Sequence, residues 1–236
     1  MPLPALKATS VRHSAEALLR CALREGRYRP GDDLSEGVMA SQMQVSRGPV
    51  REALLVLAEE GLVYHAQNRG FSVPRFTVED CSEINRVRLA LETTALELAR
   101  QRISANDLAR LEALGNRIVD LFHEAQTAAR DGAEIEFHCA IAEITGNDWL
   151  LKSLRRVIVP YFTFIGALHI QRPDLTVELV TEQHERYLDY LKGCSTAIAE
   201  ECVRFHLWNA GERGESQHSQ LELLSDSSKA GRRGDG

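Results

Sequence analysis

The chain has 236 residues, of which 44% are hydrophobic and 26% charged, and its formal net charge at pH 7 is −6. This length allows two modest domains, each with its own core, and the composition is typical of a soluble globular protein. The net charge argues against a polyanionic partner for the whole chain, but residues 1–75 carry +2 and the rest −8, so the N-terminal third is not excluded from binding nucleic acid.

The first predicted element is an amphipathic helix over residues 9–25, where apolar residues recur at helical spacing. A turn at residues 28–31 follows, and Ser35 is a favourable N-cap for a short helix that runs to Met43. Only residues 44–46 separate this helix from the next helical segment. The pattern predicts a helix, a tight turn and a second helix.

The next segment, residues 45–54, has the pattern of a helix that lies in a DNA groove. Ser46 is a favourable N-cap, and Pro49 is compatible with the first helical turn only. Arg47 and Arg51 share one face, whereas the apolar residues fall on another face that can be buried. Guanidinium groups near a helix N-terminus suit phosphate oxygens and the acceptor edge of guanine. Taken alone, the segment fits a solvated amphipathic helix equally well.

After this helix, residues 62–65 and 71–73 flank a polar turn, which predicts a small β-hairpin, or wing. Together these elements resemble the winged helix-turn-helix domain of the GntR family of bacterial transcription regulators. Five segments carry the resemblance, in the family's order and spacing: Leu34-Ser35-Glu36, Val45-Ser46-Arg47, Pro49-Val50-Arg51-Glu52-Ala53-Leu54, Glu60-Gly61-Leu62 and Asn68-Arg69-Gly70.

The resemblance implies which residues touch DNA. They are Ser46, Arg47, Gly48 and Arg51 on the recognition helix, and Arg69 and Gly70 on a wing that enters the minor groove. Two positions depart from the family pattern. Gly37 stands where relatives often carry a phosphate-binding arginine, and Gly48 stands where threonine is frequent. We therefore expect Arg47 and Arg51 to carry much of the contact.

From residue 76 to residue 212 the apolar pattern is helical throughout. Helices are predicted over residues 78–102, 104–129, 132–145, 149–169, 176–192 and 195–210. Six helices with short connections form an antiparallel bundle. The predicted fold is mainly α, with a winged helix-turn-helix domain in residues 1–75, an all-α antiparallel six-helix bundle in residues 76–212, and a disordered tail in residues 213–236.

Four residues of the bundle form a candidate metal site. Glu134 and His138 lie one turn apart on one helix face. His184 and His206 lie about 12 and 15 Å from the turn at Gly193 that joins their helices, so their imidazoles can sit level. Three imidazoles and a carboxylate suit zinc, nickel or manganese. Because the chain has 8 histidines, such spacing also arises by chance, which leaves structural histidines without a metal as an alternative.

The bundle is also similar to the FCD effector-binding domain of the FadR subgroup, in its six-helix, VanR-like variant. The similarity rests on Glu-x-x-Phe-His at residues 134–138, on Gly-Asn at 146–147, and on two downstream histidines that lie 22 residues apart. It implies a divalent metal bound by Glu134, His138, His184 and His206. Glu134 replaces the usual aspartate, and this change puts its own coordination in question.

The same similarity implies a small carboxylate effector. Arg88 matches a position that faces the effector cavity and can pair with a carboxylate. An ion pair with Glu92, one turn away on the same helix, is an equally good interpretation of this arginine. Asn147 is a further candidate for binding the effector.

The five cysteines are scattered and never spaced as Cys-x-x-Cys, which is typical of reduced core residues. With no signal peptide or membrane-spanning run predicted, we expect a cytoplasmic protein. The function we predict is a ligand-responsive homodimeric repressor of palindromic double-stranded operator DNA, and not an enzyme. The alternative is a metal-dependent enzyme acting on a small organic acid, which leaves the N-terminal domain without a role.

Overall fold

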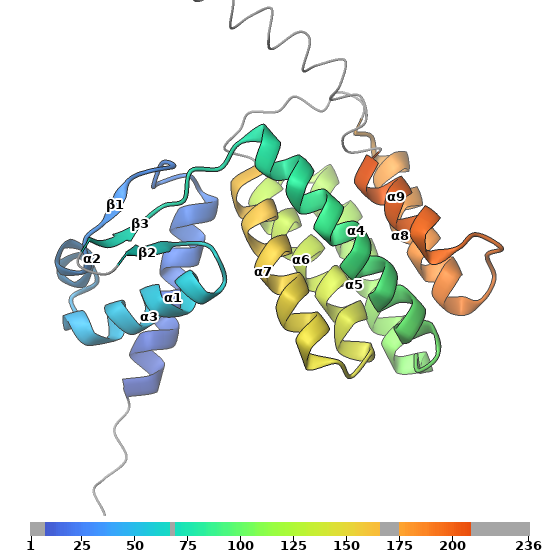
Figure 1. Cartoon of the computed structure of the whole chain (residues 1–236), viewed down its shortest axis with the longest axis horizontal. Helices are drawn as coiled ribbons and strands as arrows, with labels where there is room; N and C mark the ends of the chain where they lie inside the picture. The colour runs from blue at the N-terminus through green and yellow to red at the C-terminus, as the bar shows by residue number, and fades with distance from the viewer. Residues whose placement is uncertain (1–7, 67–68, 166–174, 209–236) are drawn as a thin grey trace, which may run out of the picture.

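The structure is a computed structural model, and it describes residues 8–66, 69–165 and 175–208 of the chain. The predicted tail at 213–236 and residues 166–169 of one predicted helix lie outside the described residues. An N-terminal unit with a small sheet lies beside a helical bundle (Figure 1). The fold is mainly α, as predicted.

Within residues 8–66 and 69–75, the N-terminal unit has three helices and a three-stranded antiparallel sheet. Its elements are α1 (Ala8–Arg24), β1 (Asp33–Leu34), α2 (Glu36–Met43), α3 (Arg47–Glu59), β2 (Tyr64–Ala66) and β3 (Gly70–Ser72). The strand order is β1-β3-β2, and the registers pair Phe71 with both Leu34 and His65. The predicted helix-turn-helix and hairpin are confirmed. Strand β1 was not predicted, because two residues give no periodicity.

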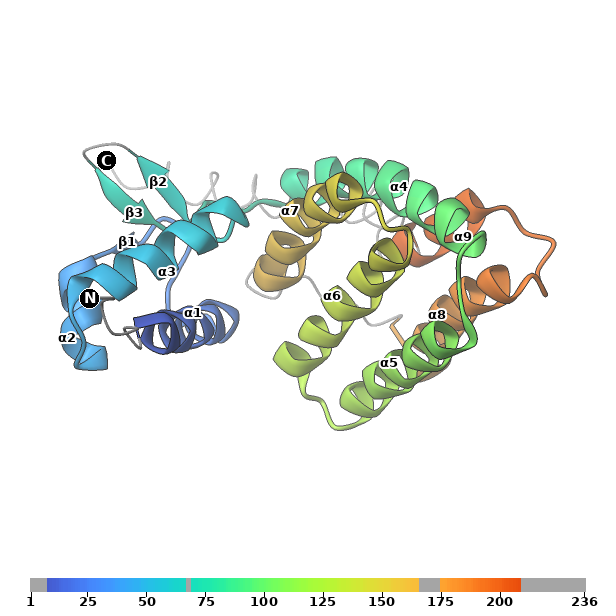
Figure 2. The same ribbon diagram turned by 90° about the horizontal axis from the view of Figure 1, so that it is seen from below.

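The bundle consists, in the described part of the chain, of six helices. They are α4 (Val78–Arg100), α5 (Ala105–His123), α6 (Thr127–Ile144), α7 (Asp148–Phe164), α8 (Val177–Lys192) and α9 (Ala199–Trp208). Helix α5 packs against α6 and α8, and α4 packs against α7 and α9 (Figures 1 and 2). None of the helices in the described ranges is long and apolar enough to cross a bilayer.

Three predicted helix boundaries were wrong. Helix α5 ends at His123, because Ala125 adopts a left-handed φ of +54° that no continuous helix allows. Helix α6 therefore begins at Thr127, five residues earlier than predicted. Helix α9 begins at Ala199 and not at residue 195.

The two units meet through α1, the turn after α3, the segment before α4, and α7. A Cβ atom at Gly61 would lie 3.1 Å from Cγ of Pro160 on α7, so the turn after α3 approaches that helix closely. The rings of Phe76 and Phe164 lie 5.7 Å apart between centroids. Apolar contacts thus hold the N-terminal unit against the bundle.

Candidate nucleic-acid interface and metal centre

The outer face of α3 presents the residues that the sequence assigned to DNA. Ser46, Arg47, Gly48 and Arg51 are all exposed, while the apolar residues of the opposite face are buried in the N-terminal core. Ser46 is the N-cap residue, but its hydroxyl makes no capping hydrogen bond. Ser46 therefore occupies the predicted N-cap position, but its side chain does not cap the helix.

Both arginines are placed by contacts with the preceding helix. Nη1 of Arg51 lies 2.7 Å from Oε1 of Glu36, in an ion pair that is open to solvent. Such exposed pairs contribute little to stability, so DNA can replace Glu36 as the partner at small cost. A Cβ atom at Gly37 would lie only 3.4 Å from Nη2 of Arg47, so glycine leaves room for this guanidinium.

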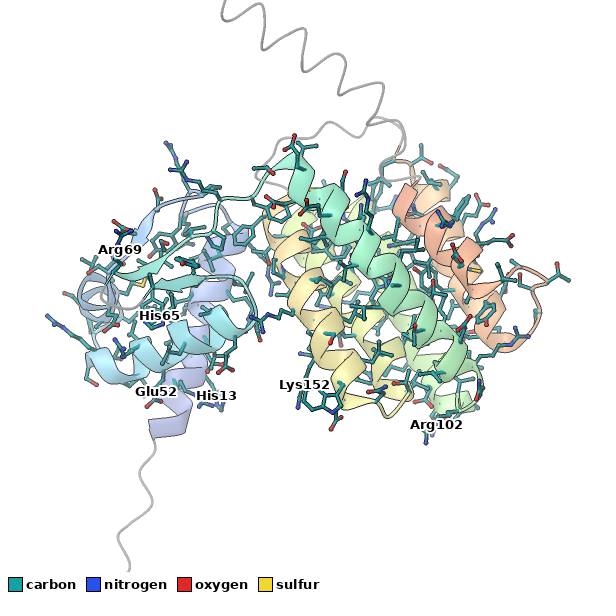
Figure 3. The ribbon with its side chains drawn as sticks, viewed as in Figure 1. His13, Glu52, His65, Arg69, Arg102 and Lys152 are labelled. Atoms are coloured by element: carbon teal, nitrogen blue, oxygen red, sulfur yellow. The ribbon has the colours of Figure 1, made fainter. Side chains whose placement is uncertain are left out.

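Arg69 and Gly70 lie in the wing, the β2–β3 hairpin of the N-terminal unit. Gly70 has a φ of +78°, a conformation that favours glycine, and it opens β3. Arg69 is exposed on the side of the sheet that faces away from the bundle (Figure 3). The ring of His65 stacks on buried Phe71 at 4.4 Å between centroids, which anchors the hairpin to the core.

The four predicted metal ligands converge at one point in the bundle. Nε2 of His138 on α6 lies 3.0 Å from Nε2 of His206 on α9. Nε2 of His184 on α8 lies 3.2 Å from Oε2 of Glu134, and the same oxygen lies 3.7 Å from Nε2 of His138. One nitrogen from each of the three imidazoles falls within 4.8 Å of the others. All four side chains are buried.

The outer nitrogens of two rings each lie beside an acceptor oxygen. Nδ1 of His184 lies 2.7 Å from the carbonyl oxygen of Val180, which only accepts, so in the neutral ring Nδ1 carries the proton and Nε2 is a bare lone pair. Nδ1 of His138 lies 2.9 Å from Oε2 of Glu92, although it makes no hydrogen bond of good geometry among the described residues. In the neutral His184 ring the Nε2 lone pair faces the carboxylate of Glu134, an arrangement of donors that suits a cation.

The protonation states agree with this donor set. Burial raises the pKa of Glu134, but His184 and His138 outweigh it, and the pKa falls well below its usual value. Burial and the charge of His138 lower the pKa of His206, so this ring is neutral. At His138 burial lowers the pKa, but Glu92 outweighs it and raises the pKa, so positive charge is favoured there. A divalent ion bound at this point would supply this charge in place of a proton.

Glu92 connects the histidine cluster to Arg88. Its Oε1 lies 2.7 Å from Nε of Arg88, and its Oε2 accepts a hydrogen bond of 2.9 Å from the hydroxyl of Tyr187. Burial raises the pKa of Glu92, but Arg88 and then His138 lower it below its usual range. The sequence identified Glu92 only as a partner of Arg88, because Tyr187 and His138 reach it from other helices.

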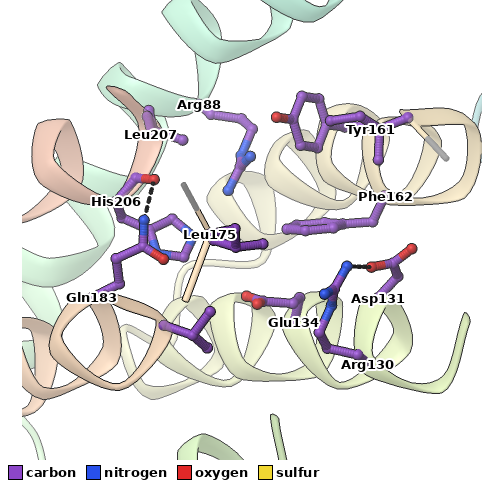
Figure 4. A pocket seen from close by; sticks show the side chains of 12 residues that line it. Arg88, Arg130, Asp131, Glu134, Tyr161, Phe162, Leu175, Gln183, His206 and Leu207 are labelled. Atoms are coloured by element: carbon purple, nitrogen blue, oxygen red, sulfur yellow. Dashed lines mark hydrogen bonds and ion pairs between the residues drawn. The ribbon is translucent and has the colours of Figure 1, made fainter. Parts of the chain in front are cut away.

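A cavity of about 520 Å³, its open mouth included, lies beside the cluster. Its walls include Arg88, Arg130, Glu134, Tyr161, Gln183 and His206. Figure 4 shows Arg88 and Glu134 pointing toward each other from opposite walls. The cavity therefore contains both a buried guanidinium and the edge of the candidate metal centre.

Arg88 forms the predicted ion pair with Glu92 and also lines the cavity. It pairs with Glu92, and its guanidinium lies 4.8 Å from the ring centroid of Tyr161 and 5.2 Å from that of Phe162. Its buried Nη2 has no hydrogen-bond partner among the described residues. An unpaired donor of this kind is costly unless a ligand satisfies it.

Asn147 is not brought to the cavity. Its Oδ1 accepts hydrogen bonds of 3.1 Å from the backbone N–H groups of Trp149 and Leu150, which makes it the N-cap of α7. It is absent from the cavity walls formed by the described residues. The structure thus gives Asn147 a capping role outside this cavity.

Comparison with known protein families finds a match for each of the two domains of the chain. Residues 12–73 match the model of the bacterial regulatory proteins of the gntR family, and residues 83–209 match the FCD domain. The chain is 26% identical to the uncharacterized HTH-type regulator YdhC of Bacillus subtilis over 80% of this chain and 84% of that protein. It is also 26% identical to the gluconate operon repressor of Bacillus licheniformis over 77% of this chain and 86% of that protein. The solved structure of Escherichia coli McbR/YncC shares the fold, with a TM-score of 0.66 at 24% identity over 92% of this chain and 98% of that one.

Proposed function

The chain belongs to the GntR family of bacterial transcription regulators and carries an FCD domain, and we propose that it is a homodimeric, metal-containing repressor controlled by a small carboxylate. The enzyme alternative is set aside, because the matched relatives are transcriptional regulators. The proposal divides the chain into a DNA-binding domain (residues 1–75) and an effector-binding and dimerisation domain (residues 76–212). The observation that carries it is the convergence of three imidazoles and a carboxylate beside a cavity with a buried arginine.

The metal would be held by Glu134, His138, His184 and His206. When bound, zinc, nickel or manganese supplies a fixed positive charge and an open position for an oxygen ligand. Oε2 of Glu134 lies within 3.7 Å of the Nε2 atoms of both His138 and His184, so glutamate in place of aspartate still reaches the centre. Buried carboxylate and imidazole groups with converging lone pairs support the proposal.

The effector would be a small carboxylate. A carboxylate oxygen satisfies the free Nη2 of Arg88 by a charge-assisted hydrogen bond, and Glu92 holds the guanidinium in place through Nε. The rings of Tyr161 and Phe162 cover the flat face of the guanidinium and exclude water from it. The effector thus meets a rigid donor at one end of the cavity.

The DNA partner would be a palindromic operator. Each N-terminal unit offers few cationic contacts, so two copies on a two-fold symmetric site give the affinity that one copy lacks. Effector binding must favour one arrangement of the two DNA-binding units, and DNA must by reciprocity alter the affinity for the effector. Repression is the mode that the name of the gluconate relative supports. Such a protein acts in the cytoplasm, where the operator lies.

Elemental analysis of the full chain, purified without a histidine tag, tests the metal site. We expect about one divalent ion per chain, because all four donors are buried and preoriented. A chain that stays free of metal after incubation with zinc, nickel and manganese in turn would refute this part of the proposal and favour structural histidines.

Replacing Arg88 with lysine is expected to weaken carboxylate binding about tenfold or more. Lysine keeps the charge opposite Glu92, but it lacks the fork that binds Glu92 and a carboxylate at once. Calorimetric titration with the small carboxylates that stabilise the wild-type chain provides the measurement. Arg86→Lys, at an exposed position of the same helix, is the matched control. Equal affinities for all three proteins would exclude Arg88 from the effector site.

A further inference from the structure

Helix α1 of the N-terminal unit ends against the first turns of α6. A Cβ atom at Gly132 would lie 2.9 Å from Nη1 of Arg24, the last residue of α1, so the guanidinium rests on the glycine backbone. Figure 2 shows the end of α1 facing the start of α6. Arg24 is half-buried, and its buried Nε has no hydrogen-bond partner in the described parts of the chain. Its side chain therefore spans the boundary between the two units.

The residue before Gly132 is Asp131, a buried carboxylate that pairs with a cation of the bundle. Oδ1 of Asp131 lies 3.3 Å from Nη2 of Arg130, and both residues line the effector cavity (Figure 4). Burial and the charge of Arg20 lower the pKa of Arg24, and Asp131 is among the groups that oppose this effect. Asp131 therefore pairs with a guanidinium of the bundle, and it directly precedes the glycine on which Arg24 of the DNA-binding unit rests.

Helix α6 connects this contact rigidly to the candidate metal centre. Asp131 and Glu134 lie less than one turn apart, and His138 follows one turn later. On the other side, α1 packs along α3, and an ion pair joins Arg20 of α1 to Glu60 after α3. A displacement of Arg24 is therefore passed to the helix that reads DNA.

Two other contacts between the units are formed without charged side chains. Gly61 meets Pro160 through backbone and ring atoms, and Phe76 meets Phe164 through aromatic rings. Such contacts hold the units together, but they carry no group whose pairing an anion in the cavity changes.

We propose that Arg24 and Asp131 transmit the state of the effector cavity to the DNA-binding unit. An anion that engages Arg130 competes with Asp131 for its guanidinium, and Asp131 then pairs more strongly with Arg24 and draws α1 toward α6. The inference rests on the proposed function and identifies the contact through which its regulation passes.

A double-mutant cycle on DNA affinity tests this contact without any effector. A duplex obtained by in vitro selection against the full chain is the probe, and fluorescence anisotropy gives its Kd. Arg130→Gln releases Asp131, so we expect it to change the Kd of the wild-type chain by about threefold or more, in the range measured for residues in contact. In a chain that already carries Arg24→Gln, we expect Arg130→Gln to leave the Kd unchanged within the error of the measurement.

Additive effects of Arg24→Gln and Arg130→Gln would overturn the proposal, as would an unchanged Kd for Arg130→Gln alone. Gly132→Ala, which displaces Arg24 without removing a charge, is expected to abolish the effect of Arg130→Gln as Arg24→Gln does. Arg27→Gln is the matched control, since Arg27 pairs with Glu25 and lies outside the contact. Circular dichroism checks that each variant folds. If the selection against the wild-type chain yields no duplex that binds, this result refutes DNA binding itself. The proposed contact between Arg24 and Asp131 is then refuted as well.

Discussion

Replacing Arg47 and Arg51 together with alanine is expected to weaken duplex binding by about 2–6 kcal/mol if both contact bases, since each base contact contributes about 1–3 kcal/mol. Both side chains are exposed on α3, and both lie close to α2. Because Gly37 has no side chain that could contact DNA, we expect these two arginines to dominate the affinity for the duplex.

Anisotropy titrations at several salt concentrations measure this effect and its origin. Loss of a phosphate contact flattens the salt dependence, whereas loss of a base contact reduces discrimination between duplexes. Arg110→Ala combined with Arg117→Ala removes two exposed arginines from the bundle and controls for net charge. If the α3 double variant binds the duplex as tightly as this control, the assignment of α3 as the DNA-reading helix is wrong.

Replacing His138 or His184 with alanine is expected to remove most of the stabilisation that zinc gives to the wild-type chain. A ligand at a thousand times its Kd stabilises the folded state by about 4 kcal/mol, provided that it binds only that state. Each of these histidines supplies one Nε2 atom to the candidate metal centre. Among the described residues, His206 is the only other histidine or cysteine that offers a ligand atom at this point.

The shift in Tm on adding zinc, measured by calorimetry, reports this loss. His123→Ala is the matched control, because His123 is exposed at the end of α5. A zinc-induced shift that persists in both His138→Ala and His184→Ala would place the ion elsewhere in the chain.

The elements that follow from local sequence were largely predictable. The helix-turn-helix, the hairpin and the six bundle helices have strong periodicity and caps, such as the capping boxes of Thr77 with Asp80 and of Ser104 with Asp107. The break between α5 and α6 was predicted six residues too late, because Ala125 is a strong helix former and no glycine or proline marks its left-handed φ.

The candidate site was predictable where one helix or hairpin sets the spacing. Glu134 and His138 share a face by periodicity alone. The similar level of His184 and His206 was predicted from a tight turn at Gly193, although α9 begins only at Ala199 and His206 lies seven residues, or about 10 Å, along that helix. Asn147 lies beyond the end of α6 and caps α7, so its distance from the centre depends on the turn between these helices. The roles of Glu92 and Arg130 depend on which helices pack together, and no local pattern reports that.

The central claim is that a metal-centred cavity in the bundle controls DNA binding by α3. Its most direct test is the Kd of a selected duplex for one preparation of the full chain, measured after chelation and again after reloading with a stoichiometric divalent metal. The account predicts a reversible change of about fivefold or more, the lower end of typical coupling between sites. An unchanged Kd, with metal occupancy verified in the same sample, would contradict it.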